Sequence, residues 1–190
     1  MMQSDLTKTK SLGADLRALR KSRGLTLSDL AHALERSVGW ISQVERDLSV
    51  PSVFDLKQIA KSLDVPVSIL FGQAQTPAME AGVVVRAHAR RPIGSKEQGL
   101  VEELLSPDLT DDFEMVHSTF DPGAHMDEAV TRPTQEVGYL VSGMLDLVID
   151  GQAFSVGAGD SFRIKGVSYR WANPYDIPAV AIWVIAPPVY

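Results

Sequence analysis

Apolar residues recur at spacings of three and four along the N-terminal third of the chain, as they do on one face of an α-helix. Thr26, Ser37 and Ser52 stand just before three of these runs, and their side chains are of the kind that caps helix N-termini. Pro51 and Pro66 interrupt the pattern, because proline disfavours helix in the residue before it. The pattern predicts five short helices around one core. Their predicted bounds are 12–22, 27–34, 37–48, 53–63 and 67–71.

The pattern changes from Val83 onward, where short runs rich in Val, Ile, Phe and Tyr alternate with Gly, Pro, Asn and Asp. No helical run lies among them, so they predict an antiparallel sandwich or barrel. Ser142-Gly143 and Asp150-Gly151 are typical of the tight turns that join hairpin strands. The predicted strands are 83–87, 100–105, 114–120, 136–141, 144–149, 152–156, 161–164, 169–172 and 179–185.

The two patterns predict two domains, an all-α five-helix bundle at residues 12–71 and an all-β domain at residues 83–190. Residues 72–82 between them are small and polar with one proline, which is typical of a linker. Residues 1–11 are polar and lack periodicity, so we expect a mobile arm there.

Two charged residues fall on the inward stripes of neighbouring predicted helices. Arg20 lies on the stripe of the first helix, and Glu45 lies four residues after Ile41 on the stripe of the third. A buried charge is costly unless it is paired. We therefore expect a structural ion pair between Arg20 and Glu45.

The outward face of the third predicted helix is small, polar and basic, and it serves no core. Such a face can lie in the major groove of DNA and read base edges. Its residues are Gly39, Trp40, Ser42, Gln43 and Arg46.

Charge is distributed unevenly along the chain. Residues 1–71 carry a net charge of +2 and residues 72–190 carry −8. This asymmetry suggests that the two domains have different tasks. The absence of cysteine excludes a disulfide framework and a thiolate metal site. There is no apolar run of about twenty residues and no signal-peptide pattern, so we expect a cytoplasmic protein that does not contact membranes.

The segments LRALRKSRGLTLSDLA, ISQVERD and PSVFDLKQIAKSLDVPVSIL resemble the XRE-type helix-turn-helix domain of phage repressors and many bacterial regulators. The resemblance covers Leu16 to Leu70 nearly without gaps. It implies that Ser37 to Arg46 is the recognition helix and that Gln43 is the most typical base reader. Arg20 and Glu45 match the family's internal ion pair.

The chain departs from the family's pattern at two points. Glu35-Arg36 replaces the usual Gly-Val at the turn, and Asp47 replaces a frequent glycine after the recognition helix, where Asp tolerates a left-handed backbone. By the resemblance, the partner is a double-stranded DNA operator. The candidate DNA-binding residues are Thr26, Ser28, Ser37, Gly39, Trp40, Ser42, Gln43 and Arg46.

The C-terminal half resembles the cupin domain, a jelly-roll barrel. The resemblance rests on DPG at 121–123, TQEVGYLVSGMLDLVIDGQAFSVGAGDSF at 134–162, YRWAN at 169–173 and AVAIWVIAPP at 179–188. A helix-turn-helix domain followed by one cupin is a common architecture of bacterial one-component regulators. In these proteins the cupin senses a small molecule or a metal.

Metal-binding cupins carry H-x-H-x3-E in the first motif and one histidine in the second. Glu136 matches the glutamate, but Val130 and Arg132 stand at the first two histidine positions. Counting back from Asn173 places Tyr169 at the third. Arginine cannot ligate, because its guanidinium stays protonated and has no free lone pair. We therefore expect no metal and no cofactor.

The other histidines are weak ligand candidates. His125 lies upstream of the first motif, where a loop position explains it more simply than ligation. His32, His88 and His117 have no ligand spacing among them.

The cupin interior instead offers a candidate site for an organic ligand, formed by Arg132, Glu136, Tyr169 and Trp171. An arginine can hold a carboxylate or phosphate through two hydrogen bonds, so we expect an anionic ligand. Gly138 shares the face of Glu136 and is expected to leave room beside it. The alternative is that Arg132 and Glu136 pair with each other in a barrel that binds no ligand.

These features predict a ligand-responsive, dimeric transcription regulator. A second hypothesis is a metal-dependent cupin enzyme fused to a DNA-binding domain. It is disfavoured because three of the four metal ligands are absent and no Ser/His/Asp, Cys/His or phosphate-loop arrangement is present. A third is an interaction module whose helical domain binds protein.

Overall fold

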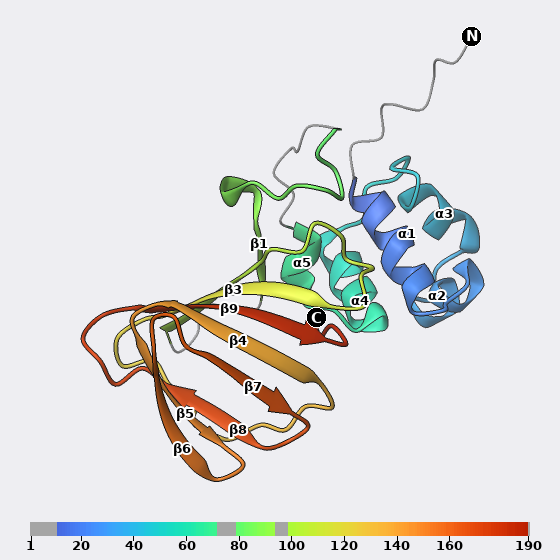
Figure 1. Ribbon diagram of the computed structural model, residues 1–190. Coiled ribbons are helices and arrows are strands. Elements are labelled where there is room, and N and C mark those ends of the chain that lie inside the picture. The colour runs from blue at the N-terminus through green and yellow to red at the C-terminus, as the bar shows by residue number, and fades with distance from the viewer. Residues whose placement is uncertain (1–10, 72–78, 94–98, 190) are drawn as a thin grey trace. The chain divides into compact units, whose positions relative to one another are not determined.

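The computed structural model describes residues 11–71, 79–93 and 99–189 (Figure 1). The described part of the chain divides into two compact units. The helical unit holds residues 11–71, 79–91 and 106–110, and the β unit holds residues 92–93, 99–105 and 111–189. The predicted arm at residues 1–11 and the predicted linker at residues 72–82 lie mostly outside the described residues.

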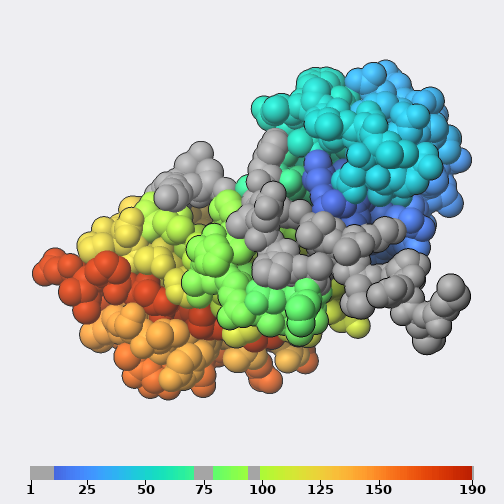
Figure 2. Space-filling model, turned by 90° about the horizontal axis from the view of Figure 1, so that it is seen from above, coloured from blue at the N-terminus to red at the C-terminus, as the bar shows by residue number. Residues whose placement is uncertain are grey.

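The helical unit begins with five helices, as predicted (Figure 1). Four of them start at a Ser or Thr whose hydroxyl accepts a backbone N–H of the first turn, which explains why these residues mark the helix starts. The helices, blue to cyan in Figure 2, pack into one continuous body. Their bounds are α1 Leu12–Ser22, α2 Leu27–Ala33, α3 Val38–Val44, α4 Val53–Leu63 and α5 Val67–Phe71.

The end of α3 differs from the prediction. The helix ends at Val44 rather than at Leu48, because Asp47 adopts a left-handed backbone with φ 60° and turns the chain. The N–H of Leu48 then donates to the carbonyl of Gln43 at 2.8 Å, which closes the helix end. Leu48 is thereby 68% exposed, so its expected place in the core is wrong.

The start of α1 lies against this same end of α3. The backbone N–H of Gly13 donates to Asp47 Oδ1 at 2.9 Å, and the hydroxyl of Ser11 donates to the other carboxylate oxygen. A side chain at Gly13 would clash with the backbone carbonyl of Val44. Asp47, which stands where the family frequently has a glycine, thus ends α3 and also caps the start of α1.

The β unit is built from two antiparallel sheets with its core between them. The larger sheet has the order β1-β2-β3-β9-β4-β7, and the smaller has β6-β5-β8. Both sheets contribute buried side chains to one core, including Phe120, Leu140, Leu147 and Trp183. The strands are β1 Arg91–Ile93, β2 Leu100–Leu104, β3 Glu114–Phe120, β4 Gln135–Ser142, β5 Met144–Ile149, β6 Gln152–Gly157, β7 Ser161–Lys165, β8 Tyr169–Ala172 and β9 Ala179–Ala186.

The strand predicted at residues 83–87 does not form. The backbone N–H groups of Val83 and Val84 both donate to the carbonyl of Glu80, so this segment is a turn, and a short 3₁₀ helix follows at Ala87–Ala89. No sheet among the described residues covers this apolar run, and Val83 is therefore 71% exposed. A short apolar run predicts a strand only where a neighbouring strand can pair with it.

We predict that Gly13→Ala lowers the free energy of unfolding of the helical unit by about 1–3 kcal/mol, the cost of forcing atoms into a packed region. The clash is with backbone, which cannot move aside as a flexible side chain can. Urea unfolding followed by far-UV circular dichroism measures the change.

The matched control is Gly39→Ala on α3, where the new methyl group would have only Ser37 Oγ within 4 Å, at 3.9 Å. This substitution should instead stabilise the unit, by about 0.5–1 kcal/mol, because alanine favours helix over glycine. Equal effects of the two substitutions would show that the contact between α1 and α3 is not tight.

Candidate functional site

The outward face of α3 is available to a partner. Gly39, Gln43 and Arg46 are exposed, whereas Trp40 and Ser42 are half-buried. Ser37 precedes the helix, and its hydroxyl accepts the N–H of Trp40 at 3.1 Å. The guanidinium Nε of Arg46 donates to the carbonyl of Ser42 at 3.0 Å, so the arginine lies along the helix end.

The candidate residues on α2 are arranged differently. Ser28 is exposed, but the hydroxyl of Thr26 donates to Asp29 Oδ2 at 2.6 Å and accepts the N–H of Asp29 at 3.1 Å. Thr26 and Asp29 form a complete capping box. The hydroxyl of Thr26 is therefore committed to the helix start.

Arg36 lies beside α3, although the sequence marks it only as a departure from the family's pattern at the turn. Its guanidinium lies 5.2 Å from the ring centre of Trp40 and 2.7 Å from Asp55 Oδ1. Glu35 before it has a left-handed backbone with φ 53°, which explains why a glycine is usual at that position. Arg36 thus places an exposed positive charge beside the face of α3.

A buried ion pair fixes the inner side of α3. Arg20 Nε and Nη2 donate to the two oxygens of Glu45 at 2.6 and 3.0 Å, and Arg20 Nη1 donates to the carbonyl of Leu25 at 2.7 Å. Arg20 and Glu45 are 7% and 8% exposed. The hydrogen bond from Arg20 to Glu45 raises the pKa of the arginine, which therefore stays protonated. The structure therefore brings together the two charges that the sequence placed on inward stripes.

Inside the β unit, the structure brings Glu136 and Tyr169 together. The carboxylate of Glu136 is 2% exposed and accepts the hydroxyl of Thr134 at 2.7 Å and that of Tyr169 at 3.2 Å. Tyr169 is held in place by two backbone hydrogen bonds with Val130. Tyr169, at the third histidine position, is thus a direct neighbour of both Val130 and Glu136.

Two further carboxylates, which were not among the predicted site residues, contribute to the electrostatics of the same interior. Glu102 on β2 faces inward opposite Ser118, whose hydroxyl donates to it at 3.0 Å. Glu114 at the start of β3 is 2% exposed and accepts the backbone N–H of Val189 at 3.0 Å. Strand alternation predicts that both carboxylates face the interior only when the register of β2 against β3 is known.

Burial shifts the protonation of these groups. It raises the pKa of Glu114 to about 7, and the charges of Glu102 and Glu136 add to the rise, whereas the N–H of Val189 and the charge of Arg132 oppose it. Burial likewise raises the pKa of Glu102 and that of the Tyr169 phenol. The interior therefore holds carboxylates that take up protons more readily than exposed ones do.

Arg132 is half-buried, and its positive charge opposes the rise in the pKa of both Glu102 and Glu114. Within residues 11–71, 79–93 and 99–189, Arg132 forms no hydrogen bond or ion pair, so the expected alternative of a direct pair with Glu136 is not what the structure shows. Its guanidinium keeps donors that a ligand can use.

Two expectations about the space around Glu136 need revision. Gly138 does not leave room beside Glu136, because the ring of Phe162 fills that space and would clash with any side chain there. Trp171 lies in the apolar core, where its ring contacts Phe120 edge-on with ring centres 4.6 Å apart. The bulk of these aromatic rings narrows the interior.

The residues at the cupin metal positions do not suit a divalent metal. Val130 offers no donor atom, and the guanidinium of Arg132 has no lone pair to share. Among the described residues, no three His, Asp or Glu side chains are grouped to hold a metal ion.

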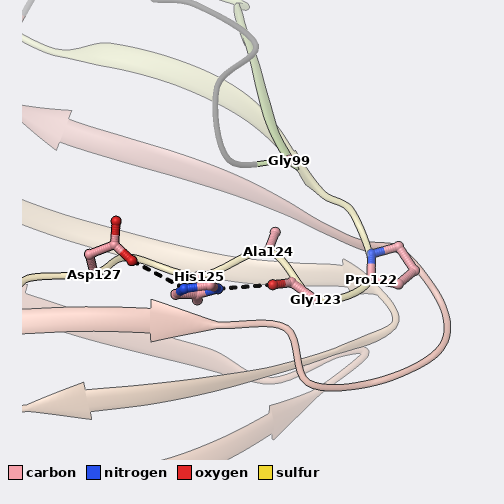
Figure 3. Close-up of a pocket in the computed structure, with 6 residues that line it drawn as sticks. All are labelled: Gly99, Pro122, Gly123, Ala124, His125 and Asp127. Atoms are coloured by element: carbon pink, nitrogen blue, oxygen red, sulfur yellow. Dashed lines mark hydrogen bonds and ion pairs between the residues drawn. The ribbon is translucent and has the colours of Figure 1, made fainter.

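His125 lies apart, at a pocket of about 330 Å³ lined by Gly99, Pro122, Gly123, Ala124, His125 and Asp127 (Figure 3). Its Nδ1 is 3.0 Å from the carbonyl of Gly123 and its Nε2 is 3.1 Å from Asp127 Oδ1, so both ring nitrogens have partners there.

Comparison with known proteins identifies both units. A family model for a helix-turn-helix domain matches residues 11–68, and a model for a cupin domain matches residues 116–185. The HTH-type transcriptional regulator SutR of Escherichia coli strain K12 is 30% identical over 168 residues, which cover 85% of this chain and 86% of that protein. The chain belongs to the XRE-type helix-turn-helix transcriptional regulators.

Two other proteins are also similar to this chain. The HTH-type transcriptional regulator PuuR of Escherichia coli strain K12 is 27% identical over 165 residues, covering 85% of this chain and 86% of that one. A solved HTH_3 family transcriptional regulator from Vibrio cholerae is 21% identical, covers 93% of this chain and 95% of its own, and has a TM-score of 0.45. None of the helices among the described residues is long and apolar enough to span a membrane.

We predict that Glu114→Gln stabilises the β unit at pH values above about 7 and leaves its stability unchanged below pH 4.5. Below 4.5, the ordinary glutamate value, the carboxyl is protonated in both the folded and the unfolded chain. As the pH rises from 4.5 to about 7, the unfolded chain releases this proton while the folded chain keeps it, so the wild type loses stability. Glutamine removes that penalty and keeps an oxygen for the N–H of Val189.

Thermal melts of the two proteins across this pH range measure the effect. Glu128→Gln, at an exposed carboxylate of the same unit, is the matched control. A pH-independent difference between Glu114→Gln and the wild type would show that Glu114 titrates normally.

Proposed function

We propose that this regulator binds a near-palindromic DNA operator as a homodimer and that a small molecule in the cupin interior controls this binding. The observation that carries the proposal is the exposed outer face of α3, whose inner side is fixed by the buried pair of Arg20 and Glu45. Because DNA is the proposed partner, we expect the protein in the cytoplasm.

The size of α3 supports a dimer. Its seven residues extend about 10 Å at 1.5 Å per residue. One such helix covers only a few base pairs, so useful affinity needs two helices related by a two-fold axis. The positive net charge of residues 1–71 suits the phosphate backbone. Arg36 and Arg46 are exposed on either side of α3 and are the natural phosphate contacts.

We propose that Gln43 reads a base edge. It is exposed, and a glutamine amide can form two hydrogen bonds with the edge of adenine. Gln43→Ala should weaken binding to the cognate operator by about 1–3 kcal/mol and relax the preference at one base position, while binding to random DNA stays unchanged. Fluorescence anisotropy titrations on both DNAs at fixed salt measure this difference.

Gln58→Ala on α4 is the matched control, since Gln58 is also an exposed glutamine of the helical unit. The operator itself can be found by sequencing genomic fragments that the purified protein retains. Equal losses on cognate and random DNA would mean that Gln43 contacts the backbone rather than a base.

The proposed effector is a small molecule with a carboxylate or similar anionic group. Arg132 would bind that group, and Glu136 with Tyr169 would orient the rest of the molecule. The charges of Glu102 and Glu114 interact with that of Arg132, and they oppose an anion while these carboxylates are ionised. Anion binding should therefore be accompanied by proton uptake, and it should strengthen as the pH falls through about 7, where Glu114 becomes protonated.

We predict that Arg132→Ala abolishes the effector response and leaves operator binding by the free protein intact. Calorimetric screening of small carboxylates, at pH values on both sides of 7, finds the effector and tests the proton uptake. Arg170→Ala, at an exposed arginine on β8, is the matched control. An effector response that survives Arg132→Ala, or stoichiometric zinc, iron or nickel in protein purified without chelator, would contradict this part of the proposal.

A further inference from the structure

The outward face of the larger sheet is apolar where antiparallel sheets usually face water with polar side chains. Across the three central strands β3, β9 and β4, the outward positions hold no lysine, arginine or carboxylate. We call this surface the outer sheet face. It consists of Met115, His117 and Thr119 on β3, Val180, Ile182 and Val184 on β9, and Val137, Tyr139 and Val141 on β4.

The side chains of the outer sheet face form continuous rows across the strands. Val184 lies opposite both Met115 and Val137, and Ile182 lies opposite both His117 and Tyr139. Tyr139 is 49% exposed, Val137 41% and Val184 40%, so the apolar surface is open to solvent. A contiguous apolar patch of this kind marks an interaction site.

Charged residues flank the outer sheet face on β2 and on β7, and the two flanks differ in sign. On the β2 flank, Glu103 faces outward opposite His117, with 3.8 Å between its carboxylate and the ring. On the β7 flank, Arg163 and Lys165 face outward opposite Val137 and Gln135. In the sheet order, β9 is equidistant from the acidic β2 and the basic β7.

We propose that the outer sheet face is the surface through which two copies of this chain dimerise, about a two-fold axis that runs along β9. This rests on the proposed function, which needs two recognition helices. Such an axis lays β7 of one copy over β2 of its partner, and β4 over β3. Two sheets packed in this way lie about 10 Å apart with strands nearly aligned.

The charges select this axis over the other two-fold arrangement of stacked sheets. An axis across the strands would lay β7 on β7 and β2 on β2, which opposes like charges at both flanks. An axis along β9 brings Arg163 near Glu103 of the partner subunit, offset by one cross-strand row of about 7 Å that an arginine side chain can span.

The size of the outer sheet face also suits a second copy. Strands β2 to β7 span about 20–24 Å across the sheet, and about six residues of each extend about 20 Å. The face therefore covers about 500 Å² on each copy, and a dimer would bury about 1,000 Å², the lower bound for a stable interface.

Charge reversal tests the interface. Arg163→Glu alone and Glu103→Arg alone should each raise the dimer dissociation constant of the full chain about tenfold, since each sets like charges against each other twice. The double variant Arg163→Glu/Glu103→Arg should restore the wild-type constant. Arg170→Glu on β8 makes the same charge change on the other sheet and should have no effect. Sedimentation equilibrium measures the constants, and thermal melts show that each variant is folded.

Chemical cross-linking provides a second readout that does not depend on affinity. The chain has no cysteine, so Ile182→Cys introduces a single thiol at the centre of β9. A two-fold axis along β9 places this thiol opposite its own copy, at a sheet separation suited to a short bis-maleimide reagent. Ile182→Cys should give a covalent dimer, whereas Ser155→Cys, exposed on β6 of the other sheet, should not.

The outcomes separate the interface from the proposed function. Failure of the double variant to rescue dimerisation, or cross-linking of Ser155→Cys but not Ile182→Cys, would overturn the outer sheet face as the interface even if operator binding persists. A wild-type chain that stays monomeric, with Ile182→Cys giving no covalent dimer, would overturn the interface together with the dimer of the proposed function. Loss of operator binding with intact dimers would contradict the proposed function alone.

Discussion

The buried pair of Arg20 and Glu45 is the interaction on which the proposed DNA-binding surface depends. Both charges are more than nine-tenths buried, and Arg20 donates to Glu45 twice and to the carbonyl of Leu25 once. A buried charge without its partner costs several kcal/mol, so neither residue can move alone. Because Glu45 directly follows α3, the pair fixes how that helix is turned about its axis. The outward position of Gln43 is a consequence of this inward constraint.

A second contact acts at the same end of α3. The carboxylate of Asp47 accepts the N–H of Gly13 in the first turn of α1, so the residue whose backbone ends α3 also caps the start of α1. Asp47 can adopt the left-handed backbone that ends α3, and its side chain also accepts hydrogen bonds, which a glycine could not do. The departure from the family's pattern thus adds a tie between α1 and α3.

Much of the fold follows from local sequence signals, and the exceptions have physical causes. The helix starts were predictable because Thr26, Ser37 and Ser52 cap them, and the Arg20–Glu45 pair followed from helical spacing. The failed strand at residues 83–87 and the exposure of Leu48 depend on partners and turns that periodicity does not report. The carboxylates of Glu102 and Glu114 join the interior only through strand register, and the ring of Phe162 beside Gly138 comes from a neighbouring strand. Such long-range pairings cannot be predicted from any single segment of the sequence.

The place of β9 in the larger sheet bears on how the protein is made. This strand is the last of the described strands in chain order, yet it lies between β3 and β4 and pairs with both. The sheet therefore cannot be completed until residues 179–186 have been synthesised, whereas the helices depend on short-range contacts and precede the sheet in the chain. A chain cut short before residue 179 would lose the centre of its sheet, and it would present the edges of β3 and β4 for aggregation. The nascent chain thus completes its helical unit before its β unit.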